Sequence, residues 1–268
     1  MTDDINNDRE DLLALGAEIS GATAGTAAGL FIGGPAGALA GAAIGPAAAE
    51  GLRWAIAEVG DRVLGRRGRQ RAMSAAIYAG QHLEELRSQG AELRSDGFFE
   101  RQDEGLSSSE EMAEGVLLAA QGSFEEHKIR HIGYLYANTA VDDGIDRYLA
   151  GMALKRAGEM TWRQYVLLAM VGSRNEIDLP QGELSDDPGA WSAWGALSEL
   201  RDLFNARYIH AGQERTDRFG LPFPGQQLTE LRLTTQGQLL HHLLSLKLIP
   251  PSEVLQVRDL LGTRTNRE

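Results

Sequence analysis

The sequence predicts a mainly α-helical protein whose C-terminal part includes a small β-hairpin. Three observations support this fold class. Glycines recur every four residues from 21 to 45, a spacing that returns to nearly the same face of an α-helix. Apolar residues at helical spacing, separated by capping residues, fill 65–158. Two short apolar runs flank a turn-rich stretch between 208 and 233, which is typical of a hairpin.

We expect four parts along the 268 residues. An acidic tail, 1–15, precedes a glycine-rich helical segment at 16–64, a helical bundle at 65–158 and a C-terminal domain at 159–268. The larger parts are long enough to bury a core.

Composition narrows the function classes. The net charge of −12 argues against tight, non-specific binding of nucleic acid. The chain has no cysteine, which excludes disulfides and thiolate zinc sites and fits a reducing compartment. The first fifteen residues are acidic, unlike the basic start of a secretory signal. We therefore expect a cytoplasmic or inner-membrane-associated location.

The N-terminal glycines define the most distinctive stretch, which we call the glycine segment. It comprises seven glycines at a spacing of four: Gly21, Gly25, Gly29, Gly33, Gly37, Gly41 and Gly45. No charge lies between Glu18 and Glu50, and an uncharged helix of this length exceeds the roughly 20 residues that span a bilayer. Gly33-Gly34-Pro35 should break it into two shorter helices. A tightly packed hairpin in a soluble protein, or an oligomer interface, therefore stays open beside membrane insertion.

The glycine segment resembles the glycine-zipper segments of bacterial membrane-associated proteins. That resemblance implies close helix–helix packing, often between identical copies, and in some cases a pore. We therefore expect a homo-oligomer, with the seven glycines at a membrane or oligomer interface.

Five arginines lie within ten residues after the glycine segment: Arg62, Arg66, Arg67, Arg69 and Arg71. They would mark the cytoplasmic side of an inserted segment, or contact anionic lipid headgroups. A solvated linker between two helices explains them equally well.

The bundle region predicts several helices and caps. We expect a helix from Pro46 to residue 64, a second at 72–95, a third capped by one of the serines 107–109 and a fourth at 123–140 with Phe124 on its buried side. Asp142 or Asp143 should cap a fifth at 145–158. The loop 95–105 should expose Phe98 and Phe99.

The C-terminal part resembles a winged-helix domain. A helix at 161–172 with a Thr161 cap and a second helix at 191–206 lead to a strand at Tyr208-Ile209. A wing at 210–228 and a strand at 228–233 follow, and "LT..G..L...L" opens the closing helix behind Thr234 or Thr235. This resemblance concerns the fold and says little about function.

The middle and C-terminal parts also resemble uncharacterised bacterial proteins, some of them encoded among anti-phage and abortive-infection genes. The stretches that carry the resemblance are EEHKIRHIGYLYANTAV, MTWRQYVLLAMVG and LTTQGQLL. It implies a setting in bacterial defence.

Two patterns resemble metal-binding or catalytic motifs. Asp142, Asp143 and Asp146 match the DDxxD motif of magnesium–diphosphate enzymes, but they lie at a helix start, where capping explains them better. His127 and His131 share a helix face as two zinc ligands would, but their segment is basic and lacks the glutamate of HExxH. We expect no catalytic residue, no cofactor and no metal.

DNA binding by the winged-helix-like part has weak support. Residues 160–268 hold 11 basic and 13 acidic residues, and a DNA-reading module normally shows a basic face. Arg201 on the second helix, with Arg215 and Arg218 in the wing, are the candidate phosphate contacts. We expect protein contacts instead.

These observations predict a membrane-acting or self-assembling non-enzymatic effector in bacterial defence, with pore formation as one form of its action. The alternative is a soluble winged-helix regulator or adaptor in which the glycine segment is an oligomer interface. The trigger and the partner remain unnamed.

Overall fold

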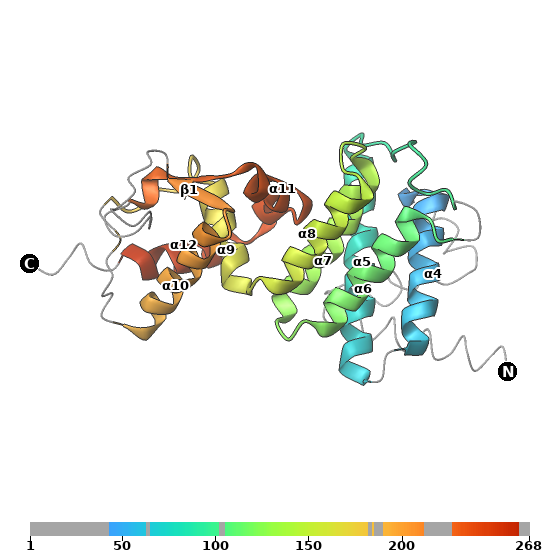
Figure 1. The fold of residues 1–268 in the computed structure, drawn as a ribbon, viewed down its shortest axis with the longest axis horizontal. Coiled ribbons are helices and arrows are strands. Elements are labelled where there is room, and N and C mark those ends of the chain that lie inside the picture. Colours follow the sequence, from blue (N-terminus) through green and yellow to red (C-terminus); the bar gives the residue numbers. More distant parts are fainter. Residues whose placement is uncertain are drawn as a thin grey trace, which may run out of the picture. The chain divides into compact units, whose positions relative to one another are not determined.

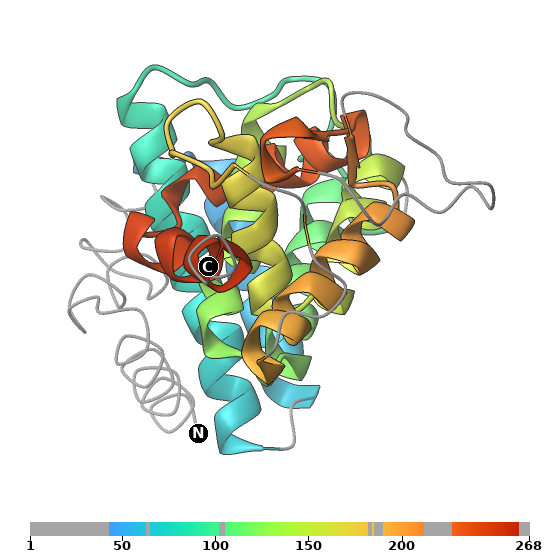
Figure 2. The same ribbon diagram turned by 90° about the vertical axis from the view of Figure 1, so that its left-hand side faces the viewer.

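The structure is a computed structural model, and it describes residues 43–62, 65–101, 105–181, 184, 190–211 and 227–262. The chain divides into two compact units at the boundary between Glu159 and Met160, and each is described by itself. The described residues are mainly helical with one two-stranded antiparallel sheet (Figures 1 and 2). The predicted fold class is confirmed at this level.

The first unit is built from helices that alternate in direction (Figure 1). They are α4 (Pro46–Arg62), α5 (Arg66–Ser88), α6 (Ser108–Gly122), α7 (Glu126–Val141) and α8 (Arg147–Glu159). Arg71 near the start of α5 lies 3.8 Å from Glu126 at the start of α7. Arg94, which follows α5, donates to the Thr139 carbonyl near the end of α7. These contacts show that α5 and α7 run side by side in the same direction.

Buried polar contacts tie α4 into the bundle. The Tyr136 hydroxyl on α7 donates to the Ala48 carbonyl on α4 at 3.2 Å and lies 2.9 Å from Ser109 Oγ on α6. Burial raises the pKa of Tyr136 above its usual range, so the hydroxyl keeps its proton. Although the sequence grouped 46–64 with the glycine segment, α4 packs as one of the bundle helices.

Two helix starts in this unit test the predicted caps. Ser107 caps α6 in a capping box, since its side chain accepts from Glu110 N while the Glu110 carboxylate accepts from Ser107 N. For α8 the prediction of Asp142 or Asp143 was wrong. Asp146 lies next to the helix start and its Oδ1 accepts from Leu149 N at 2.7 Å, because the chain still turns at Gly144.

The described part of the second unit packs four α-helices and a two-stranded antiparallel sheet. Its elements are α9 (Trp162–Gly172), α10 (Trp191–Asn205), β1 (Ile209–Ala211), the 3₁₀ turn η1 (Leu228–Glu230), β2 (Leu231–Leu233), α11 (Thr235–Leu243), the 3₁₀ turn η2 (Leu246–Leu248) and α12 (Pro251–Gly262). The strands pair antiparallel, with Ile209 opposite Leu233. Thr161 and Thr234 cap α9 and α11. Residues 212–226, which hold most of the predicted wing, lie outside the described residues.

Three predictions of detail were wrong. The helix predicted at 72–95 begins at Arg66 and ends at Ser88, so the arginines after residue 65 are helical and do not form a linker. Phe98 is only 4% exposed because the Arg94 guanidinium stacks over its ring at 4.6 Å. Phe124, expected in the core, precedes α7 and is 80% exposed.

Among the described helices, none combines the length and the apolar character that crossing a bilayer requires. Gly21 to Gly41 of the glycine segment lie outside the described residues. Gly45 is described and has a φ of +91° just before α4, a conformation that favours glycine.

Candidate functional site

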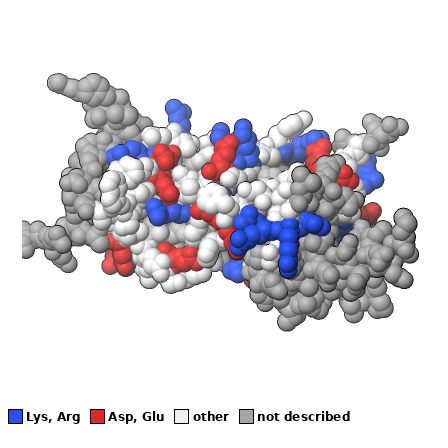
Figure 3. Space-filling view, turned by 90° about the horizontal axis from the view of Figure 1, so that it is seen from below, with Lys and Arg blue, Asp and Glu red and all other residues white. Residues whose placement is uncertain are grey.

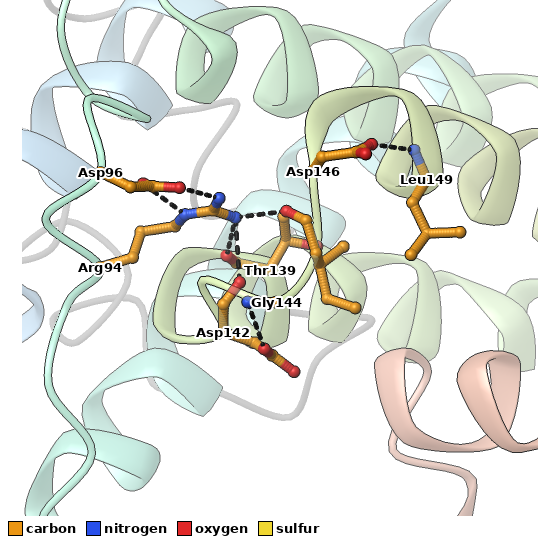
Figure 4. A network of polar contacts seen from close by, with 8 residues as sticks. Arg94, Asp96, Thr139, Asp142, Gly144, Asp146 and Leu149 are labelled. Atoms are coloured by element: carbon orange, nitrogen blue, oxygen red, sulfur yellow. Dashed lines mark hydrogen bonds and ion pairs between the residues drawn. The ribbon is translucent and has the colours of Figure 1, made fainter.

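The acidic residues of the DDxxD match shape the turn between α7 and α8. Asp142 Oδ1 accepts from Gly144 N at 3.0 Å, and Asp146 caps α8. Figure 4 shows these carboxylates turned toward backbone amides. Within the described parts of the chain, no group of three His, Asp or Glu side chains is placed to hold a metal ion.

Arg94 organises the same turn from the neighbouring loop (Figure 4). Its Nη1 donates to the carbonyls of Thr139, Asp142 and Ile145 at 3.2, 3.0 and 2.6 Å. Thr139 is in the last turn of α7, where carbonyls lack helical partners, and Asp142 and Ile145 follow in the turn that leads to α8. Its Nε donates to Asp96 Oδ1 at 2.8 Å, and this hydrogen bond holds the pKa of Asp96 below its usual value. The cluster therefore has a structural role.

The two histidines considered as zinc ligands differ in environment. His127 is exposed, whereas His131 is 2% exposed and packs edge-on against the Tyr134 ring at 5.5 Å. Between them, Lys128 is buried and its Nζ donates to the Gly158 carbonyl at 3.1 Å. Burial lowers the pKa of Lys128. The expectation of a solvated helix face was wrong for His131 and Lys128, because this side of α7 packs against α5 and α8.

The arginine cluster forms the first turns of α5. Arg67 lies 3.2 Å from Glu126 and is still 75% exposed, while Arg71 reaches the same carboxylate from a more buried position. Arg66 is exposed. The side chain of Arg62 lies outside the described residues.

These arginines break a local rule of helix electrostatics. The first turn of α5 has no acidic residue, and its N-cap residue is Gly65, which has no side chain to accept from the free backbone amides. Cations at a helix N-terminus are unfavourable by about 0.3–1 kcal/mol each, and an anion bound there would reverse that penalty. Basic residues at the positive end of a helix dipole do not stabilise the helix, so we take them as a candidate functional site.

Phe124 is the residue that sequence reasoning missed. It stands two positions before Glu126, which Arg67 contacts, so it belongs to the same end of the unit. Ser123 caps the end of α6 and its Oγ donates to Glu125 O at 3.1 Å, which fixes the turn that presents Phe124. The Gly122-Ser123 pair before it was the available signal, since it ends a helix and leaves the next residue in a turn.

The basic end is the name we use for Arg66, Arg67, Arg69, Arg71 and Phe124. Seen from below, Lys and Arg side chains gather on the side where α5 begins (Figure 3). This end is the candidate functional site of the first unit.

In the second unit, the candidate DNA contacts are only partly described. Arg201 is half-buried on α10, and Arg215 and Arg218 lie outside the described residues. The exposed aromatics of α10 are more prominent. Trp191 is 88% exposed, Trp194 is 52% exposed, and their rings meet edge-on at 6.2 Å.

Comparison with known proteins found no matching family model, no matching curated protein and no matching solved structure.

Proposed function

We propose that this protein is a non-enzymatic effector that assembles through its glycine segment and acts at a membrane. The observation that carries the proposal is the fixed point at which the glycine segment joins the first unit. Arg87 Nη1 donates to the Ala43 carbonyl at 2.5 Å. A Cβ on Gly45 would overlap the Leu93 side chain. A segment held at one end by a rigid body can join copies in a defined arrangement.

The position of that point favours self-assembly as the first role of the glycine segment. Arg87 lies near the end of α5, whereas Arg66 lies at its start, about 32 Å away at 1.5 Å per residue. The arginine cluster therefore lies far from Ala43, the residue at which the glycine segment joins the first unit. We therefore assign separate roles to the glycine segment and to the arginine cluster.

The resemblance to proteins encoded among anti-phage genes makes bacterial defence the setting for this assembly. In that setting a trigger would favour the assembled form by population shift. In that setting, the assembled glycine segment would act on the membrane by forming a pore.

The test replaces two glycines by a bulky residue. Gly29→Leu with Gly37→Leu should prevent close helix approach, lower the mass measured by light scattering and abolish toxicity on overexpression. The matched control, Gly151→Leu with Gly158→Leu, adds the same groups on α8, where a Cβ meets nothing within 4 Å. Unchanged mass and toxicity in the first variant would overturn the proposal.

The second candidate is a soluble winged-helix regulator or adaptor. It is supported by the order α9, α10, β1, β2, α11 and by the exposed Trp191 and Trp194 on α10, a helix that also carries Glu199 and Asp202. Exposed tryptophans are typical of protein contacts, so an adaptor fits better than a DNA reader. Retention on DNA at moderate salt, lost in the variant Arg201→Gln, would favour the regulator.

A further inference from the structure

The two ends of the first unit differ in which charges gather there. The basic end lies where α5 and α7 begin. At the other end lie Asp142, Asp143 and Asp146, with Asp96 held beside them by Arg94, and we call this the acidic end. The 23 residues of α5 separate the two ends by about 34 Å. An anionic surface would therefore orient the unit with its basic end inward.

Each end also exposes one aromatic side chain. Phe124 at the basic end is 80% exposed, and Tyr148 at the start of α8 is 79% exposed. Arg147 lies over the Tyr148 ring and bonds Glu111 at 2.7 Å, so its charge is compensated. At the basic end Arg67 shares a single carboxylate with Arg71. Charge, and not exposed aromatic area, distinguishes the two ends.

We infer that the basic end docks on an anionic lipid surface, with Phe124 inserted among the headgroups. Arginines near such a surface are attracted by the charge of the lipid, and an exposed aromatic gains by leaving water. The net charge of −12 repels an anionic surface, so binding to such a surface requires a local group of basic residues like this one. The inference rests on the proposed action at a membrane and names the surface that makes contact.

The orientation has a consequence for assembly. Docking by the basic end leaves Ala43, where the glycine segment joins the unit, about 30 Å from the lipid. The forty-two residues before Ala43 are long enough to cover that distance even as a helix. Because the basic end and the glycine segment's junction at Ala43 are this far apart, substitutions in one should leave the role of the other unchanged.

The experiment is sedimentation of the full-length protein with lipid vesicles. Vesicles of phosphatidylcholine alone are compared with vesicles that contain phosphatidylcholine and phosphatidylglycerol in equal amounts. We expect binding to the anionic vesicles only, with a steep fall at high salt. Arg66→Gln, Arg67→Gln and Arg69→Gln together should weaken it about 100-fold, and Phe124→Ser about tenfold.

The acidic end supplies the matched control. Arg147→Gln with Tyr148→Ser removes one arginine and one equally exposed aromatic, and should bind anionic vesicles like the unmodified protein. Phe124→Ser changes an exposed side chain, so it remains informative even if the triple arginine variant fails to fold. Full binding by both basic-end variants, equal binding to neutral vesicles, or retention of DNA in place of vesicles would overturn the inference.

The glycine variant separates this inference from the proposed function. Gly29→Leu with Gly37→Leu should lose assembly and keep binding to anionic vesicles. If that variant assembles normally while the basic-end variants lose vesicle binding, the inference stands and the proposed assembly fails. If the glycine variant loses vesicle binding and the basic-end variants keep it, the glycine segment contacts lipid and the inference fails.

Discussion

Gly133 on α7 lies directly against Ala75 on α5. A Cβ built on Gly133 would stand 2.5 Å from the Ala75 carbonyl oxygen and 3.1 Å from Ala79 N. Both are backbone atoms of a helix, so they cannot rotate away as a side chain would. The parallel pair α5 and α7 therefore approaches as closely as it does because this position carries no side chain.

Gly133→Ala should destabilise the first unit by about 2 kcal/mol, the usual cost of forcing an extra carbon into a packed interior. Urea unfolding followed by circular dichroism measures it. Gly151→Ala on α8 is the control, since a Cβ there meets nothing within 4 Å. It should be neutral or stabilising by up to about 1 kcal/mol. Equal effects of the two changes would contradict the close approach.

Arg94→Met should destabilise the same unit by about 3 kcal/mol. The change leaves the carbonyls of Thr139, Asp142 and Ile145 without their shared donor, and unsatisfied buried polar groups are costly. The comparison is Arg147→Met, which removes an exposed arginine that pairs with Glu111 and should cost less than about 1 kcal/mol. A loss of similar size in both variants would show that Arg94 contributes only as an ion pair.

Glu110 should make the stability of the first unit depend on acid pH. Hydrogen bonds from Arg101 and Ser107 hold the pKa of Glu110 below its usual value of 4.5. The folded pKa is the lower one, so the stabilisation is fully present above pH 4.5 and is lost as pH falls through the folded pKa.

Unfolding of the unmodified protein and of Glu110→Gln from about pH 7 to pH 3 tests this dependence. The difference in unfolding free energy between the two proteins should be constant above pH 4.5 and shrink below it. A difference that stays the same to the lowest pH would exclude the carboxylate as its source.

Gly237→Ala should separate α11 from the hairpin of the second unit. A Cβ on Gly237 would overlap the Tyr208 carbonyl oxygen, which also accepts from Thr234 N at 3.0 Å. We expect a loss of about 3 kcal/mol, since backbone must shift to admit the methyl group. Gly195→Ala on α10 meets only the flexible end of Arg163 and should have little effect. A protein that tolerates both changes equally would contradict this packing.

Local signals predicted much of the secondary structure. Ser107, Thr161 and Thr234 were expected at helix starts and are found there, because a cap depends on residues within one turn. Pro46 begins α4 for the same reason. The sheet was also expected, since two short apolar runs beside a turn-rich stretch describe a hairpin without distant contacts.

The candidate site was less predictable because it depends on burial. The arginines were visible in the sequence, but their place on α5 depends on a helix that starts six residues earlier than its apolar pattern does. Phe98 was expected to be exposed and is buried, whereas Phe124 was expected in the core and is exposed. An aromatic residue in a loop is buried or exposed according to its tertiary neighbours, here the Arg94 guanidinium over Phe98 and the capped turn at Ser123 before Phe124.

The sequence by itself determined the helical class, the caps, the small sheet and the charge of each segment, since all of these follow from spacing and from neighbours within a few residues. Only the tertiary structure decided which residues share an end of the first unit. The alternation of helix directions brings Arg67 beside Glu126 and carries Arg87 to the far end, beside Ala43. Sequence distance does not measure spatial distance once helices of about 30 Å turn back on one another.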